Sequence, residues 1–404
     1  MSIAATASPT SVAQKTTLAI IVAVSVCHLI NDIMQSLLAA IYPILKVNYG
    51  LDYVQIGLLT LTFQCVASLL QPAIGMYTDK RPLPYSLPVG MASSLVGLIV
   101  LGFAHSYWLL LVGSAFVGLG SAIFHPESSR VARLASGGRH GFAQSLFQVG
   151  GNAGSAIGPL LAAFIVVPHG QWSIALFGLG SLVGIVILWR VGGWYAAHRR
   201  ANAGRMPAST ALIFERRTTL VALGVLTVLT ISKNAYTASL SSYYTFFLID
   251  KFHVDVQTAQ LLLFAYLGAS AIGVFIGGPI GDRFGSKFVI WFSILGVLPI
   301  TLLLPYADLT WTVVLSIAAG LVLSSAFPAM VVFAQELLPG RVGLVAGIFF
   351  GFAFGAGGIA AAALGALADV TGIQYVFWLC SFLPVAGLLT VFLPDMAKAR
   401  RVAA

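Results

Sequence analysis

A set of polar side chains recurs at helical spacing in an apolar segment near the start of the chain. The set consists of His28, Asp32, Gln35 and Tyr42, with the amide Asn31 beside Asp32. Residues four, three and seven apart lie on one face of a helix. A carboxyl group next to an imidazole can bind and release a proton when it is removed from water, because desolvation favours the neutral acid. The alternative interpretation is a set of structural hydrogen bonds to a neighbouring helix.

The composition decides where this polar face must point. Of the 404 residues, 59% are hydrophobic and only 8% are charged, whereas a soluble protein is about one quarter charged. The chain therefore uses the lipid bilayer as its solvent. A charge at the bilayer centre costs at least about 2.5 to 3.5 kcal/mol, so we expect Asp32 to face the interior of a helix bundle. The cysteines Cys27, Cys65 and Cys380 lie in apolar runs and are expected to be unpaired.

Proline, glycine and charged residues divide the chain into twelve apolar segments, each close to the roughly 20 residues that a membrane-spanning helix needs. The expected spans are residues 17–45, 55–77, 85–104, 107–134, 138–167, 171–195, 218–249, 256–281, 287–305, 309–335, 342–368 and 373–393. An even number of spans places both termini on one side of the membrane.

The distribution of lysine and arginine predicts which side that is. These residues gather at the even-numbered connections and the C-terminus, whereas only Lys46 and Lys251 fall at the opposite loops. By the positive-inside rule, both termini are expected in the cytoplasm. The net charge of +9 follows from this topology and from contact with lipid, and it gives no reason to expect a nucleic-acid partner.

The two halves of the sequence resemble each other. A shift of 202 residues pairs Arg139 with Arg341 and Pro126 with Pro328. The expected organisation is an N-terminal tail at 1–16, six-helix bundles at 17–195 and 218–393, a basic linker at 196–217 and a C-terminal tail at 394–404. Parallel repeats of this kind are typical of transporters that bind their substrate between the two halves, near the middle of the membrane.

Three motifs carry a resemblance to a known family. "GPIGDRFGSKF" at 278–288 resembles the cytoplasmic signature of the major facilitator superfamily, and "GMYTDKRPLPY" at 75–85 is its first-half copy, with Pro82 and Pro84 as departures. "GNAGSAIGP" at 151–159 is similar to a signature of the antiporters of that family. The string "FHPESSRVARLASGGRHGFAQSLFQVGGN" at 124–152 resembles a group of bacterial drug exporters within it, and the likeness runs from about residue 18 to 395.

The resemblance implies an all-α integral membrane protein with twelve transmembrane helices in two pseudo-symmetric bundles and a central cavity at their interface. It implies a proton-coupled antiporter of the bacterial inner membrane that exports small drugs, such as the anionic phosphonate fosmidomycin, by alternating access. Small-molecule substrate, protons and lipid are the expected partners, and a monomer is the expected state.

The paired signatures also have a physical interpretation. Gly75 and Gly278 lie one turn before Asp79 and Asp282, where a missing side chain lets helices approach closely. The acid can then pair with a basic residue or cap the start of a facing helix and so clamp the cytoplasmic side; an ordinary turn between helices is the alternative. The residues predicted to gate the protein are Gly75, Asp79, Lys80, Arg130, Arg139, Gly154, Gly158, Pro159, Gly278, Asp282, Arg283 and Arg341.

The seventh span, with "SKNAYTASLSSYY" at 232–244, carries the cation that the first span lacks. Lys233 corresponds to Asn31 in the repeat. A buried lysine beside tyrosine hydroxyls can hold a phosphonate or carboxylate oxygen, or it can be the partner of Asp32. The residues predicted to bind substrate are Asn31, Gln35, Tyr42, Gln148, Asn152, Lys233, Asn234, Tyr236, Tyr243 and Tyr244.

The fourth span ends in a second polar group. Glu127 and Arg130 are neighbours on one turn, while His125 and Glu127, two residues apart, point in different directions. The resemblance implies that these three residues act in the cytoplasmic half of the cavity, and an ion pair that fixes the helix end is the alternative. The residues predicted to couple protons are His28, Asp32, His125 and Glu127. No metal site is expected, because His125, Glu127 and His140 lack metal-ligand spacing.

Two other functions compete with export. An importer of an anionic metabolite would use a similar cavity. A membrane enzyme acting on a lipid-linked substrate would be expected to have long loops with clustered acids or histidines, and the longest connector is basic and lacks them. The chain has no nucleotide-binding loop of the GxxxxGK[ST] type. We therefore expect a transporter without a cofactor, not an enzyme.

Overall fold

The computed structural model describes residues 16–51, 53–202 and 213–396, and their regular structure is entirely helical. Eleven helices are long and apolar enough to cross a membrane, and Ser86–Gly102 is a shorter apolar helix of 17 residues. Together they account for the twelve predicted spans. Most of the predicted tails and part of the linker lie outside the described residues.

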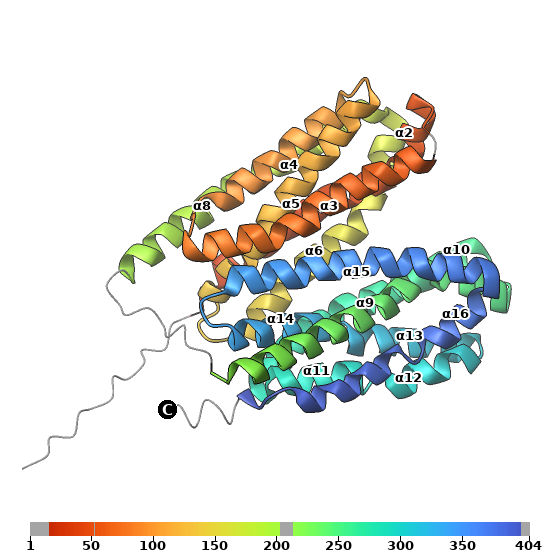
Figure 1. Ribbon diagram of the computed structural model, residues 1–404. Helices are drawn as coiled ribbons and strands as arrows, with labels where there is room; N and C mark the ends of the chain where they lie inside the picture. The colour runs from red at the N-terminus through yellow and green to blue at the C-terminus, as the bar shows by residue number, and fades with distance from the viewer. Residues whose placement is uncertain (1–15, 52, 203–212, 397–404) are drawn as a thin grey trace, which may run out of the picture.

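The first half forms one group of roughly parallel helices, drawn from red to yellow-green in Figure 1. Its elements are α1 (Leu18–Ala40), α2 (Tyr42–Tyr49), α3 (Tyr53–Lys80), α4 (Ser86–Gly102), α5 (Tyr107–Ala135), α6 (His140–Leu161), the π-helix η1 (Ala162–Val166), α7 (Val167–His169), the 3-10 helix η2 (Gln171–Phe177) and α8 (Gly178–Ala201).

The second half forms the other group, drawn from green to blue. Its elements are α9 (Arg216–Phe252), α10 (Val256–Phe284), α11 (Ser286–Ile294), α12 (Leu298–Leu303), η3 (Leu304–Tyr306), α13 (Leu309–Leu323), α14 (Ala326–Leu337), α15 (Val342–Thr371), α16 (Ile373–Cys380) and η4 (Leu383–Phe392).

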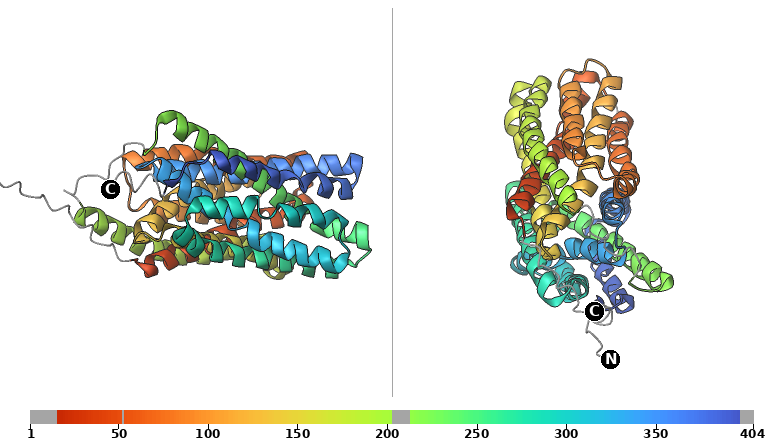
Figure 2. Two further views of the ribbon diagram at one scale, coloured as in Figure 1. Left: turned by 90° about the horizontal axis from the view of Figure 1, so that it is seen from below. Right: turned by 90° about the vertical axis from the view of Figure 1, so that its left-hand side faces the viewer.

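The two groups meet chiefly along two helix pairs, α3 with α15 and α6 with α10, and α5 also packs against α15 and α14 against α6. Figure 1 shows α6 and α15 in the middle of the molecule, and Figure 2 shows the two groups end-on. We call the end at which α8 ends and α9 begins the linker end, and the opposite end the far end. Both described termini lie at the linker end, since Thr16 bonds to Ser136 after α5 and Lys287 at the start of α11 bonds to Leu393.

Several spans predicted as single helices are interrupted. The first span ends at Ala40, and α2 begins at Tyr42 with a proline in one of its first two positions. Proline has no N–H and is favoured at the start of a helix and not inside it. The same device starts α12. As a result Tyr42, predicted to share a face with His28 and Asp32, begins a new helix instead.

Candidate functional site

A buried polar cluster joins α1 to α5. The His28 and His125 rings lie nearly perpendicular to each other, with their Nε2 atoms 3.2 Å apart. Asp32 lies beside both rings, with Oδ2 at 3.5 Å from Nε2 of His28 and Oδ1 at 3.7 Å from Nε2 of His125. All three side chains are at least nine-tenths buried, so their charges are shielded from both water and lipid. The structure therefore places three of the four predicted proton-coupling residues together.

Amides and hydroxyls orient the Asp32 carboxylate. Asn31 donates through Nδ2 to Oδ1 at 3.2 Å, and Gln35 donates through Nε2 to the same oxygen at 2.9 Å. The Ser155 hydroxyl donates to Oδ2 at 3.4 Å. Ser121 on α5, which the sequence did not single out, donates to Oε1 of Gln35 at 3.0 Å. Asn31 and Gln35, predicted as substrate ligands, thus serve the cluster in this structure.

Glycines of α6 make room for the cluster. A Cβ atom at Gly151 would collide with the His28 ring and lie 2.9 Å from Oδ2 of Asp32. Gly154 and Gly158 pack against the backbone and side chains of α1 one and two turns farther along. Shortly after Pro159 the helix widens into the π-helix η1, a feature that often marks functional segments of helices.

A cavity of about 340 Å³ lies at the seam between the halves. Gln148, Asn152 and Ser155 of α6 line one wall, and Lys233 of α9 lies among the residues of the other half. Because the Ser155 hydroxyl also reaches Asp32, the cavity wall is in hydrogen-bond contact with the buried cluster. Three of the predicted substrate ligands therefore meet at the seam. Thr237, Tyr266 and Phe327 were not predicted and line the same cavity.

Lys233 has no carboxylate partner among the described residues. Its Nζ atom lies 3.4 Å from Oδ1 of Asn234 and 5.8 Å from the centre of the Phe327 ring. Asp32 is therefore not its partner in this structure. Two nearby amide atoms, Nδ2 of Asn234 and Oε1 of Gln148, are buried without a hydrogen bond, and buried polar atoms of this kind call for an additional partner.

The tyrosines of α9 do not take the predicted positions. Tyr244 is fully buried and its hydroxyl bonds to Ser316 of α13 at 2.8 Å, within the second half. Tyr243 donates to the Ala361 carbonyl at 2.6 Å. Tyr236 is buried, and none of the three lines the seam cavity. The face shared with Lys233 turns into the packed interior because α13 and α15 cover the later turns of α9.

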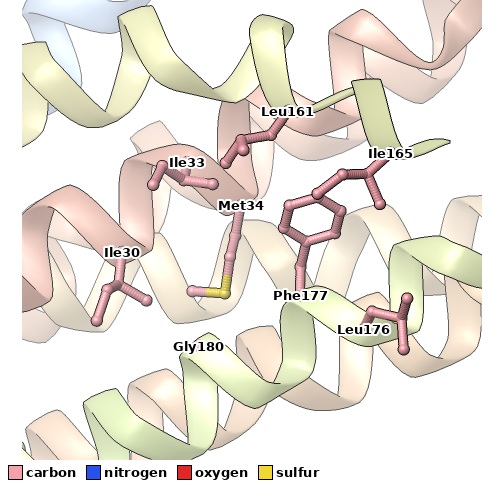
Figure 3. Close-up of a pocket in the computed structure, with 8 residues that line it drawn as sticks. All are labelled: Ile30, Ile33, Met34, Leu161, Ile165, Leu176, Phe177 and Gly180. Carbon is pink, nitrogen blue, oxygen red and sulfur yellow. The ribbon is translucent and has the colours of Figure 1, made fainter. Parts of the chain in front are cut away.

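A second pocket lies on the other side of α1. Figure 3 shows it between Ile30, Ile33 and Met34 of α1 and residues of α6, η1, η2 and α8. The lining residues beyond α1 are Leu161, Ile165, Leu176, Phe177 and Gly180. Every side chain around this pocket is apolar, so it offers nothing to hold an anion. The polar cavity at the seam is the better candidate for a substrate site.

The linker end is closed by two matched contacts. Asp79 at the end of α3 accepts hydrogen bonds from the backbone N–H groups of Gly343 and Leu344, at 2.9 and 2.8 Å. Asp282 at the end of α10 accepts from Gly141 and Phe142, at 2.7 and 2.9 Å. Each carboxylate thus occupies the N-terminus of a helix in the other half, where the helix dipole favours negative charge.

Glycine is required for this approach. A Cβ atom at Gly75 would collide with the backbone of Gly343, and one at Gly278 would meet the backbone oxygen of Gly141 at 2.6 Å. The helices α3 and α15, and likewise α10 and α6, therefore cross in direct backbone contact.

The predicted set of His125, Glu127 and Arg130 divides into two. His125 belongs to the cluster on α1, whereas Arg130 binds Glu127 at 2.5 Å and Asp79 at 2.6 Å. Arg130 also donates to Thr78 at 3.0 Å, and the Ser86 hydroxyl donates to Glu127. Residues two apart on α5 point to different neighbours, which explains the division. Arg130 and Glu127 anchor the first of the two linker-end contacts.

The remaining predicted gating residues lie on the surface of the linker end. Lys80, Arg139, Arg283 and Arg341 are exposed. Arg139 and Arg341 immediately precede α6 and α15, the two helices whose first turns receive the carboxylates. They therefore lie at equivalent places in the two halves.

A network of amide, hydroxyl and guanidinium groups that was not predicted crosses the seam at the same end. Gln335 of α14 donates to Ser129 at 3.1 Å and accepts from Arg133 at 3.2 Å. Ser129 donates in turn to Gln144 at 2.8 Å. Ser129, Arg133 and Gln144 lie within the string at 124–152, but nothing in that string indicates that Gln335 of the other half meets them.

Comparisons with known proteins agree with this architecture. The model of the Major Facilitator Superfamily matches residues 24–249 and 225–404. The chain is 55% identical over 381 residues to the fosmidomycin resistance protein of Escherichia coli (strain K12), covering 94% of each chain. It is 40% identical to the uncharacterized MFS-type transporter YfnC of Bacillus subtilis (strain 168), again over 94% of each.

Among solved structures, the transporter FucP in its outward conformation matches with a TM-score of 0.72 at 15% identity, covering 93% of this chain and 99% of that one. This likeness concerns the fold. The twelve helices in two bundles, the cavity at their seam and the family match point to transport and not to an enzyme. The chain belongs to the major facilitator superfamily of membrane transporters.

Proposed function

We propose that this chain is a proton-coupled antiporter that exports a small anionic drug such as fosmidomycin by alternating access. The observation that carries the proposal is the seam cavity. Lys233 lines it and has no carboxylate partner in the part of the chain that the structure describes, and Ser155 connects the cavity wall to the buried cluster of His28, Asp32 and His125. One site can hold an anionic oxygen, and the other can hold a proton. The name of the relative from Escherichia coli supports the choice of fosmidomycin.

The linker end is proposed to be the cytoplasmic end of a monomer in the bacterial inner membrane. Basic residues collect there, as the positive-inside rule requires of a cytoplasmic face. Asp79 and Asp282 clamp this end against α15 and α6. Transport then requires these contacts to open so that the cavity faces the cytoplasm, and to close again before the drug leaves at the far end.

Direct drug transport tests this proposal. Purified protein is reconstituted into liposomes, and uptake of radiolabelled fosmidomycin is followed with an imposed proton gradient, with and without an uncoupler. We expect uptake to depend on the gradient and to fall at least tenfold for Asp32→Asn, which cannot carry a negative charge beside the histidines. His105→Gln, in an exposed loop, is the matched control and should resemble the wild type.

The result also decides between export and its rivals. Uptake that is unchanged by the uncoupler would remove proton coupling. Drug movement in the same direction as protons would favour import of an anion. In cells, the gene should raise resistance to fosmidomycin, and the uncoupler should cancel that resistance.

A further inference from the structure

Both cluster histidines carry a hydrogen on Nδ1. Nδ1 of His28 lies 2.7 Å from the carbonyl oxygen of Phe147, and Nδ1 of His125 lies 3.0 Å from that of Ser121. A carbonyl oxygen only accepts hydrogen bonds, so each ring must donate. The Ser121 hydroxyl, 3.3 Å from Nδ1 of His125, donates to Gln35 and so accepts from the ring as well.

The orientation of Gln35 supports this assignment. Its Nε2 donates to Asp32 and its Oε1 accepts from Ser121. The reverse orientation would place an amide oxygen against a carboxylate oxygen. The hydrogen-bond order therefore runs in one direction, from His125 to the Ser121 oxygens and from Ser121 through Gln35 to Asp32.

The contact between the rings needs one more hydrogen. The two Nε2 atoms are 3.2 Å apart, and without a hydrogen between them two lone pairs would face each other. Two neutral imidazoles carry one ring hydrogen each, and both are already on Nδ1. We infer that His28 and His125 share a single proton between their Nε2 atoms, and that this is the proton exchanged for substrate; the second part rests on the proposed antiport.

The surroundings are suited to one positive charge. Asp32 accepts from three neutral donors and lies beside both rings, so as a carboxylate it balances the added proton. The Phe147 ring stacks on His28 with centroids 4.1 Å apart, and the Phe350 ring of α15 lies 5.1 Å from that of His125. Aromatic faces attract cations.

The other ionisable groups on the surrounding helices are already accounted for. On α5, Glu127 and Arg130 bind each other. The part of α6 that packs on the two rings contributes Phe147, Gly151 and Ser155, none of which is charged. Lys233 on α9 lines the cavity beyond Ser155. The pair and Asp32 thus form one unit with a single exchangeable proton.

The route for that proton leads to the cavity. Oδ2 of Asp32 lies 3.5 Å from Nε2 of His28 and also accepts a hydrogen bond from Ser155 on the cavity wall, so this one oxygen connects the pair of rings to the cavity. When the proton passes to water in the cavity, two neutral rings and one carboxylate remain. The facing lone pairs then repel, so the rings must move apart, and release of the proton changes the packing of α1 against α5.

Proton release on drug binding tests the shared proton. Fosmidomycin is added to purified protein in weak buffer at pH 7.5, and released protons are counted against bound drug. The wild type should release about one proton per bound molecule. His28→Gln, His125→Gln and the double variant should all release none while still binding the drug, whereas His105→Gln should behave as the wild type. Full release from either single variant would show that the proton resides on Asp32 and would overturn the inference.

A spectroscopic test does not depend on transport. In protein labelled with nitrogen-15 at its seven histidines, one protonated Nε2 shared between two rings should persist at pH 7.5, where histidines with an ordinary pKa of about 6.5 are mostly neutral. The signal should vanish in His125→Gln and remain in His105→Gln. The inference would be overturned if the wild type lacked this signal. It would also be overturned if the purified wild type contained one equivalent of a bound transition metal and His125→Gln did not. If the signal is present but fosmidomycin neither binds nor releases protons, the proposed function fails instead.

Discussion

The two halves of the molecule share an arrangement of helices and differ in the ionisable side chains that they bury. At the repeat shift of 202 residues, Thr230 takes the place of His28, Asn234 that of Asp32, Phe327 that of His125, Ala329 that of Glu127 and Val332 that of Arg130. The first half thus contains the buried acids and imidazoles, and the second half contains Lys233. The repeat therefore shares its architecture, while the buried acids and imidazoles lie on one side of the seam and Lys233 lies on the other.

The linker-end contacts show the same asymmetry on a smaller scale. Asp79 and Asp282 each accept hydrogen bonds from two backbone N–H groups at equivalent positions of the facing helix. Only Asp79 is also bound by a buried arginine, which is held in turn by Glu127. The helix cap is therefore the shared element, and the Arg130 ion pairs are an addition of the first half.

The largest effect is expected from Arg130→Met. This change keeps much of the side-chain volume but leaves Glu127 and Asp79 without their cation, and removal of one partner from a buried ion pair costs about 3 to 5 kcal/mol. The thermal denaturation midpoint of the purified protein in detergent should fall, together with transport.

The double variant Arg130→Met, Glu127→Gln is the control for that prediction. It removes the stranded carboxylate and should recover part of the stability, because the two residues are coupled. If Arg130→Met denatures at the wild-type temperature, the first-half contact is no stronger than the second.

The helices and the seam could be predicted from the sequence because their causes are local or periodic. Proline, glycine and charge mark the span ends, so α5 begins at Tyr107 and α15 at Val342, as expected. The paired signatures likewise indicated Asp79 and Asp282, since each combines a small residue with an acid one turn later. Such patterns can be recognised from the order of residues alone.

The assembly of the site could not be predicted in the same way. Helical spacing tells which residues share a face, but it does not tell which neighbour that face meets. His28 and His125 are 97 residues apart in sequence, and only the packing of α1 on α5 brings their rings together. Tyr244 has the correct spacing from Lys233 and yet packs against α13. The interruption of the first span at Ile41 separates Tyr42 from its predicted face.

A second prediction tests whether the second half supplies the counter-charge. Lys233→Met should weaken binding of anionic drugs by about 10- to 100-fold, because a hydrogen bond from a charged donor is worth about 1.5 to 3 kcal/mol. A neutral analogue should lose little. Asn234→Asp sharpens the test, since it restores the acid of the first half next to Lys233, whose Nζ lies 3.4 Å from the present amide oxygen. The new carboxylate should compete with the anion. Equal losses for charged and neutral compounds, measured by equilibrium binding, would contradict the assignment.

A third prediction concerns the close approach of a glycine to the facing backbone, which the two linker-end contacts share. Gly75→Ala and Gly278→Ala should both open the linker end, because either methyl group would overlap the facing backbone and overpacking costs about 1 to 3 kcal/mol. Spin labels at the exposed positions Arg81 and Phe284, in a background with Cys65→Ser, report the distance between the halves. Both variants should populate a longer distance. Gly281→Ala, whose Cβ would meet Val289 at an ordinary 3.6 Å, is the control. A change in only one of the two variants would show that the contacts are not mechanically equivalent.

The smallest effect is expected from Asp282→Asn. The amide keeps one acceptor oxygen in place of two, so one of the N–H groups of Gly141 and Phe142 loses its partner while the other stays capped. Loss of a helix-capping interaction costs about 0.5 to 2 kcal/mol, and asparagine is itself a good cap, so the shift should lie near the lower limit. The same spin labels should show a modest rise in the open population. Asp79→Asn should have a larger effect, because Arg130 then loses a charged partner as well. If the two variants open the linker end equally, the Arg130 ion pairs do not strengthen closure, and their role is confined to holding α5 and α3 within the first half.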